Sequence, residues 1–159
     1  MKVVKPPHNF KTDKFTVFLA GSIEMGKAID WQKAVAEHCK DLDVVFFNPR
    51  RDDWDNSWKQ TLDDENFVGQ VEWELEHLES CDLVAMFIDG NTKSPITLIE
   101  FGLFLDRVRT GEKKMVLFCE DNFFRKGNMD VTSLFYEVDN AHSFEQFLDK
   151  IETYIKAGK

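Results

Sequence analysis

The segment Leu83–Ile88 restricts the fold of this chain more than any other, because all six of its residues are apolar. A strand with one face in solvent alternates apolar and polar residues, whereas a strand covered on both faces is apolar throughout. Asp89-Gly90 ends the run with residues that favour a turn. The segment is therefore predicted to be a central strand of a sheet with helices on both faces.

Further strands and helices are expected to alternate along the chain. Short segments rich in β-branched and aromatic residues predict three more strands, at 15–20, 44–47 and 115–119. The spacing of apolar residues predicts amphipathic helices at 26–40, 65–80 and 143–156. Ser94-Pro95 supplies the N-cap and the first turn of another helix. In the helix at 65–80, the buried stripe is expected to consist of Phe67, Val71, Leu75 and Leu78.

Two segments have weaker patterns. Residues 1–14 contain two prolines and several charges without periodicity, which predicts an irregular lead-in. A fifth strand is predicted near residues 134–136. The alternation of strands and helices predicts an α/β fold. We expect a flavodoxin-like, doubly wound parallel sheet of four to five strands with helices on both faces, in a single domain over residues 1–159.

Composition narrows the classes of function. The 159 residues suit one globular domain, with 43% hydrophobic and 31% charged residues. Twenty basic against 29 acidic residues give a net charge of −9, which disfavours a partner such as a nucleic acid polymer. The absence of a long apolar run predicts no membrane association, and three widely spaced cysteines suit a reducing, cytoplasmic location.

The predicted topology locates a ligand site before any motif is considered. In a flavodoxin-like order, the first and third strands flank the point where the strand order reverses, and ligands bind outside their carboxyl ends. Those ends are Gly21-Ser22 and Asp89-Gly90. Side chains that follow these two strands, Ser22 and Asp89 among them, are therefore expected to face the ligand.

Glu100 is a candidate catalytic residue because of the helix that carries it. Residues 96–105 are apolar on nearly every face, so this carboxylate cannot easily reach bulk water. Its position less than two turns after Ser94 would let it reach the crevice. The alternative is that Glu100 belongs to a buried hydrogen-bond network without a catalytic role.

Glu74 is a second candidate. It lies three and four residues from members of the apolar stripe of its helix, which places a carboxylate beside the buried face. Glu72, Glu76 and Glu79 are better explained as solvated surface charges. Without Glu100, surface charge would also be the better explanation for Glu74.

Other motifs give weaker indications. Residues 21–28 resemble a phosphate-binding P-loop, but Ala28 replaces the hydroxyl that would bind magnesium, so a tight turn is expected instead. His77 and Cys81 share a helical face without a third ligand, so no metal and no other cofactor is expected. Arg50 and Arg51 form either surface salt bridges or an anion pocket.

Five sequence blocks in order resemble the nucleoside 2-deoxyribosyltransferase-like family. They span about residues 17–130, and each block has low specificity when it is taken alone. The blocks are residues 20–26, 48–54, 70–75, 94–102 and 124–128.

The resemblance implies a flavodoxin-like fold and cleavage of an N-glycosidic bond. Glu100 matches the glutamate that attacks the anomeric carbon and forms a covalent deoxyribosyl ester, which a second nucleobase resolves. Glu74 matches an aspartate, 26 residues before the nucleophile, that manages the proton of the departing base. Asn128 matches an asparagine donated across a subunit interface, which implies a homodimer or higher homo-oligomer.

The resemblance also implies a binding site for a small nucleoside or nucleotide and a free nucleobase. Its second block contributes Arg50, Asp53 and Trp54 as expected substrate-binding residues, and Trp54 and Trp58 could stack on the base. No cofactor is needed, because a carboxylate traps the cationic sugar and a second acid protonates the base.

The sequence departs from the transferases at positions that bear on the substrate. Ser94 stands six residues before Glu100, where transferases usually have an aspartate that holds sugar hydroxyls. The related deoxynucleoside monophosphate N-glycosidases have a serine there and use it on the 5′-phosphate, although Glu24 replaces their nearby arginine. Phe18 replaces a tyrosine whose hydroxyl positions the nucleophile. Three functions therefore stay open: a deoxyribosyltransferase, a monophosphate N-glycosidase, and a nucleotide-binding module without turnover.

Overall fold

The computed structural model describes residues 1–23, 29–51, 55 and 57–158. In this part of the chain there are six strands and five helices. The strands are β1 (Lys2–Val4), β2 (Phe15–Gly21), β3 (Val44–Phe47), β4 (Leu83–Ile88), β5 (Lys114–Cys119) and β6 (Asp139–Asn140). The helices are α1 (Trp31–His38), α2 (Glu65–Ser80), α3 (Pro95–Arg109), α4 (Lys126–Phe135) and α5 (Phe144–Ala157).

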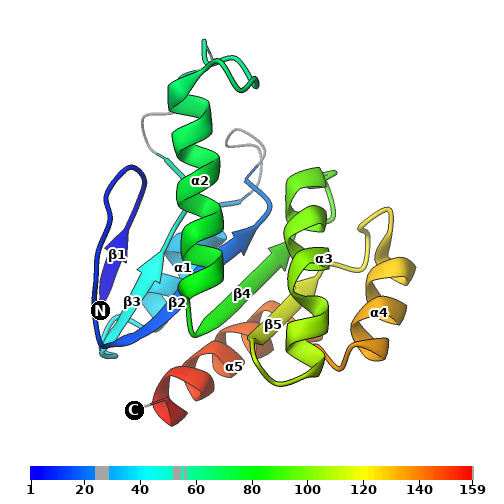
Figure 1. The fold of residues 1–159 in the computed structure, drawn as a ribbon. Coiled ribbons are helices and arrows are strands. Elements are labelled where there is room, and N and C mark those ends of the chain that lie inside the picture. Colours follow the sequence, from blue (N-terminus) through cyan, green and yellow to red (C-terminus); the bar gives the residue numbers. More distant parts are fainter. Residues whose placement is uncertain (24–28, 52–54, 56, 159) are drawn as a thin grey trace.

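The strands form one parallel sheet in the order β1-β3-β2-β4-β5-β6. Without β1, this is the flavodoxin-like order, so the expected fold class is confirmed. Helices α2, α3 and α4 cover one face, and α1 and α5 cover the other (Figure 1). Of these described helices, none combines the length and the apolar character needed to cross a bilayer.

Strand β4 lies inside the sheet between β2 and β5, as its apolar sequence predicts. All six of its residues are buried. Val84, Met86 and Ile88 point to the layer of α2 and α3, where they join Trp73 and Phe101. The alternate residues of β4 pack with the aromatic cluster under α1 and α5, which contains Trp31, Phe87 and Phe147. Burial on both faces explains why no polar residue interrupts this strand.

Two strand expectations were wrong. The lead-in 1–14 is not wholly irregular, because β1 pairs with β3 at the edge of the sheet, and this raises the strand count to six. Residues 134 and 135 end α4 instead of forming a strand, and β6 follows at 139–140. Leu134 and Phe135 are largely exposed, while Met129 and Ser133 anchor the helix. Burial of Met129 and Ser133, four residues apart on one face of α4, therefore outweighs the strand preference of residues 134–136.

The boundaries of α2, α3 and α5 were close to expectation, whereas α4 was not expected and the predicted stripe of α2 was right only at Leu78. Helix α1 begins at Trp31, later than the expected 26. In α2, the residues that face the sheet are Gln70, Trp73, His77 and Leu78, whereas Leu75 is 44% exposed. Trp73 and His77 stack at 4.1 Å between ring centroids, and burying these two large rings sets the rotation of the helix. Glu74 lies between Gln70 and Leu78 on the i, i+4 row at the edge of that buried face.

The end of β2 approaches β4 closely at Gly21. Its φ of 146° lies in a region that side chains rarely adopt, and a Cβ there would lie 2.1 Å from the carbonyl oxygen of Phe87. We expect Gly21→Ala to lower the free energy of unfolding by more than about 2 kcal/mol, because the backbone of both strands must shift. Urea denaturation measures this change.

Gly69→Ala is the matched control. Gly69 lies exposed in α2 with nothing within 4 Å of an added Cβ, so alanine there should raise stability by about 0.5 to 1 kcal/mol. A neutral or stabilising Gly21→Ala would contradict the close approach of β2 to β4.

Candidate active site

The carboxyl ends of β2 and β4 meet at one edge of the sheet, where the topology places the crevice. The backbone N–H of Ser22 donates to the carbonyl of Phe87 at 2.9 Å, and the N–H of Asp89 donates to Ser22 Oγ at 3.0 Å. Helix α3 begins beside them at Pro95. The residues after both strands and the start of α3 therefore form one connected unit.

Three buried hydroxyls form a cluster at the start of α3. Ser22 Oγ lies 2.5 Å from Ser94 Oγ and 2.9 Å from Thr92 Oγ1, and Thr92 and Ser94 are 2.7 Å apart. Thr92 was not predicted, although a hydroxyl residue two positions before Ser94 is the signal that could have indicated it. The cluster offers several oxygen and hydrogen positions to a polar ligand at the amino end of a helix.

Ser94 occupies the N-cap position as expected, but not as a side-chain cap. Its backbone is left-handed, with φ 44° and ψ 49°, and its hydroxyl makes no cap hydrogen bond. The hydroxyl instead contacts Ser22 and Thr92. A non-glycine residue that its surroundings hold in a left-handed conformation is a feature often associated with functional sites.

Glu100 and Glu74 approach each other from two helices. Glu100 points from α3, where it is only 8% exposed. Burial raises its pKa to about 8, and the nearby charge of Glu74 raises that pKa as well. Burial raises the pKa of Glu74 to about 7, which a hydrogen bond from Gln70 opposes. Desolvation and the nearby second carboxyl group therefore both favour the protonated form of Glu100.

Gln70 connects Glu74 to the loop after β3. Its Nε2 donates to Glu74 Oε1 at 2.7 Å and to the carbonyl of Pro49 at 3.2 Å. Its Oε1 accepts from Arg51 Nη1 at 3.4 Å, and the Arg51 guanidinium lies over the ring of Trp58 at 5.0 Å. Gln70 was not predicted, but its position four residues before Glu74 on the same helix could have indicated it.

The other expected substrate residues are more widely placed. Arg50 donates to the carbonyl of Ile29 at 3.1 Å and to Gln32 at 3.5 Å, on the side of the crevice toward α1. Asp89 Oδ1 accepts from the backbone and side chain of Asn91, so that it shapes the turn before α3. Asn128 is exposed on α4, and α3 separates α4 from α2 (Figure 1). Asp53 and Trp54 lie outside the described residues, as do Glu24 and Ala28.

The residues considered for metal binding in α2 have other roles. His77 Nδ1 lies 2.7 Å from the carbonyl oxygen of Trp73, and its ring packs against Phe47. Cys81 donates to the carbonyl of Leu78 at 3.4 Å, and burial raises the pKa of its thiol. Both residues therefore contribute to the core between α2 and the sheet.

A cavity of about 670 Å³ lies at the opposite edge of the sheet, away from the carboxylate pair. Residues 9–14 cover it, with Thr16 and Asp82 near the amino ends of β2 and β4. In a parallel α/β sheet, ligands bind at the carboxyl edge. The chemistry of the side chains, and not cavity size, makes Glu74 and Glu100 the candidate site.

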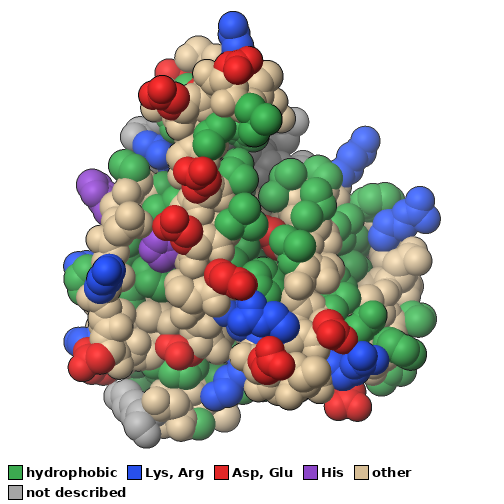
Figure 2. All heavy atoms as spheres, viewed as in Figure 1, with side chains coloured by type: hydrophobic (Ala, Val, Ile, Leu, Met, Phe, Trp, Pro, Cys, Tyr) green, Lys and Arg blue, Asp and Glu red, His purple; other side chains and the backbone are tan. Residues whose placement is uncertain are grey.

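The outer face of α3 is apolar although it is exposed. Ile96, Ile99 and Leu103 are each more than half exposed, and Leu75 of α2 is 44% exposed. Figure 2 shows hydrophobic side chains along the facing flanks of α2 and α3. An apolar surface of this kind, beside a crevice that contains two carboxylates, is typical of an interaction face.

The raised pKa values make stability depend on pH. The folded chain keeps protons on Glu74 and Glu100 that the unfolded chain releases near the usual pKa of 4.5. Stability is therefore lost as pH rises from about 4.5 through about 7 to 8. Glu74→Gln cannot ionise and can still accept from Gln70. It should raise the free energy of unfolding on the order of 2 to 3 kcal/mol at pH 8 and much less at pH 4.5, by urea denaturation.

Glu72→Gln on the exposed face of α2 is the control, because it should show no such gain at pH 8. Equal pH dependence in the two variants would contradict the burial of Glu74.

The sequence and the fold of this chain are both similar to those of known proteins. A sequence profile of the family described as nucleoside 2-deoxyribosyltransferase like matches residues 14–123. The crystal structure of a conserved protein from Enterococcus faecalis V583 has a similar fold, with a TM-score of 0.58 and 15% identity, covering 92% of this chain and 99% of that chain. No curated protein matches the chain. Because the profile covers most of the 159 residues, with Glu74 and Glu100 inside the matched range, the chain belongs to the nucleoside 2-deoxyribosyltransferase-like family.

Proposed function

We propose that this protein cleaves the N-glycosidic bond of (deoxy)nucleosides and transfers the deoxyribosyl group to another nucleobase. The observation that carries this proposal is the pair of the half-buried Glu74 and the buried Glu100, held on two helices with pKa values raised toward neutrality. Glycosidic chemistry needs one ionised carboxylate to trap the sugar and one acid to protonate the departing group. Two neighbouring carboxyl groups with raised pKa values can supply both.

In the proposed mechanism, Glu100 is the nucleophile. Its carboxylate attacks the anomeric carbon as the bond to the base breaks, and a glycosyl ester forms. Glu74 gives its proton to the departing base, whose nitrogen keeps the bonding electrons. A second base then attacks the same carbon, gives a proton back to Glu74, and releases Glu100 as a carboxylate.

The distribution of the proton changes when substrate binds. Burial raises the pKa of both groups, and the charge of Glu74 also raises that of Glu100, so Glu100 is proposed to carry a proton before substrate binds. A sugar that gains positive charge beside Glu100 stabilises its ionised form and moves the proton toward Glu74. Gln70 holds Oε1 of Glu74 at 2.7 Å and leaves Oε2 for the proton.

The hydroxyl cluster favours a second candidate, hydrolysis of (deoxy)nucleoside 5′-monophosphates. Ser22, Thr92 and Ser94 lie at the amino end of α3, where backbone N–H groups and the helix dipole favour an anion. Water would then replace the acceptor base. A module that binds nucleotides without turnover is less favoured, because it has no use for two buried carboxylates, which are costly to the fold.

The apolar face of α3 supports a homo-oligomer. Covering Ile96, Ile99 and Leu103 with a second copy would remove apolar surface from water beside the crevice. In such an assembly, Asn128 of α4, which is exposed in one copy, could serve the crevice of the other, as the family resemblance implies.

Product analysis tests the proposed function directly. The protein is incubated with deoxynucleosides, deoxynucleoside monophosphates and free bases, and the mixture is separated by chromatography. Exchanged nucleosides indicate transfer, free base with sugar phosphate indicates the hydrolase, and an unchanged mixture rejects both. Glu100→Ala should lower base release at least a hundredfold, since loss of a covalent nucleophile costs several kcal/mol of barrier. Glu72→Ala, exposed on α2, should keep wild-type activity.

Ser94→Asp separates the two substrate classes. A carboxylate at this position repels a 5′-phosphate and can accept hydrogen bonds from a neutral sugar, and aspartate tolerates the left-handed backbone. The ratio of kcat/KM for a nucleoside to that for its monophosphate should rise by about tenfold or more. Ser94→Ala removes the hydroxyl without adding charge and is the control. An unchanged ratio in Ser94→Asp would show that a 5′-phosphate does not bind at this position.

A further inference from the structure

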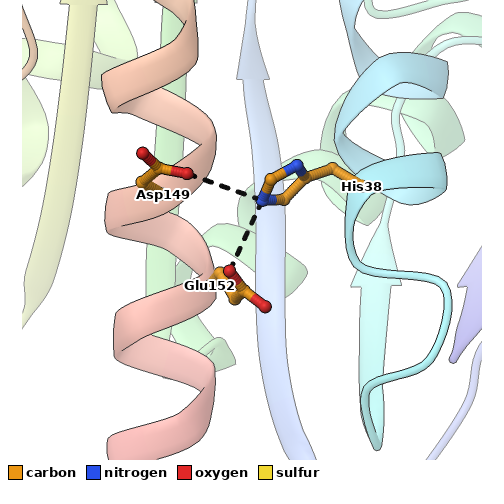
Figure 3. A group of neighbouring side chains, drawn as sticks. All are labelled: His38, Asp149 and Glu152. Carbon is orange, nitrogen blue, oxygen red and sulfur yellow. Dashed lines mark ion pairs between the residues drawn. The ribbon is translucent and has the colours of Figure 1, made fainter.

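A group of potential metal ligands lies on the opposite face of the sheet from the carboxylate pair. His38, the last residue of α1, points between Asp149 and Glu152 of α5 (Figure 3). Its Nε2 lies 3.9 Å from Asp149 Oδ1 and 3.6 Å from Glu152 Oε2. All three ligand atoms lie within 4.8 Å of one another. Among the described residues, this is the group of three or more whose geometry could hold an ion.

The backbone that carries this group is fixed by the core. Asp149 and Glu152 are three residues apart on α5 and so share one face of the helix. Beneath them, Ile151 of α5 and Val35 of α1 are fully buried in the same apolar cluster. The three ligand side chains therefore start from fixed positions on two packed helices.

We propose that His38, Asp149 and Glu152 form a binding site for a divalent transition-metal ion, with Zn²⁺ as its typical occupant. Zinc binds imidazole nitrogen and carboxylate oxygen at about 2.0 to 2.2 Å, and its tetrahedral angles place two ligand atoms about 3.3 to 3.6 Å apart. The separation of 3.6 Å between His38 and Glu152 matches this spacing, and the 3.9 Å between His38 and Asp149 must shorten by a few tenths of an ångström when the ion binds. Asp149, with a side chain 64% exposed, is free to complete the set, and water fills the fourth position.

The neighbouring lysines do not occupy the carboxylate oxygen of Glu152 that faces His38. Lys156 Nζ contacts Glu152 Oε1 at 2.7 Å, which leaves Oε2 for the ion. Lys40 pairs with Glu37 at 2.9 Å. Cys39 is next in sequence, but its side chain is fully buried in the apolar cluster beneath the site, so it is not counted as a ligand.

The donor set selects against the common alkaline-earth ions. Mg²⁺ and Ca²⁺ prefer oxygen ligands only, whereas an imidazole nitrogen favours zinc and related transition metals. An ion at this position would tie the end of α1 to α5. It would not touch Glu74 or Glu100, which lie across the sheet, so base release should not require it.

Thermal unfolding of the full chain, stripped with chelator and then titrated with ZnCl₂, tests the site. At about a hundredfold excess over the dissociation constant, the midpoint should rise by roughly 5 °C or more, because the ion binds only the folded chain. Calorimetric titration should give one ion per chain. MgCl₂ at the same concentration should leave the midpoint unchanged.

Variants separate the proposed site from other surface groups. His38→Ala and Asp149→Asn should each remove most of the zinc-dependent rise, and Asp149→Asn keeps the histidine in place. His142→Ala is the matched control, because His142 is exposed just before α5 and should leave the rise intact. A rise that persists in His38→Ala, or no rise in the wild-type chain, would overturn the proposal and leave these residues as an ion pair.

Discussion

The burial of β4 on both faces is the constraint from which the rest of the structure follows. A strand without polar side chains cannot face water on either side, so two helical layers must cover it. Parallel pairing with β2 then brings both carboxyl ends to one edge, where Gly21 lies against Phe87 and Ser22 accepts from Asp89. The position of the crevice is thus a consequence of core packing.

The carboxylate pair is costly to the fold and useful to the proposed chemistry for the same reason. Desolvation disfavours the charged forms of Glu74 and Glu100, which reduces stability at and above neutral pH. That same desolvation keeps one proton available and strengthens the interaction of a carboxylate with a cationic sugar. The apolar residues around these two groups therefore act on both stability and reactivity.

Sequence patterns could predict the fold class and suggest the chemical groups of the candidate site, but not the contacts between distant segments. The boundaries of β3, β4 and α2 matched the expectation because their patterns were long or uninterrupted. The strand β1 could not be predicted, since three residues acquire strand geometry only by pairing with β3. The rotation of α2 depends on the stacking of Trp73 with His77, and periodicity alone favoured a different stripe. Gln70 and Thr92 acquire their place in the site from partners 20 or more residues away, Pro49 and Ser22.

The sequence of α3 is apolar on nearly every face, although only two of its faces have a neighbour among the described residues. Phe101, Phe104 and Leu105 pack on the sheet, and Glu100 points toward α2. The sheet and α2 account for these two faces, yet Ile96, Ile99 and Leu103 remain exposed. An unaccompanied helix in water would have polar residues at those three positions. Their apolar character is explained if a second copy of the chain forms the third neighbour, and Glu100 would then lie close to the surface that joins the two copies.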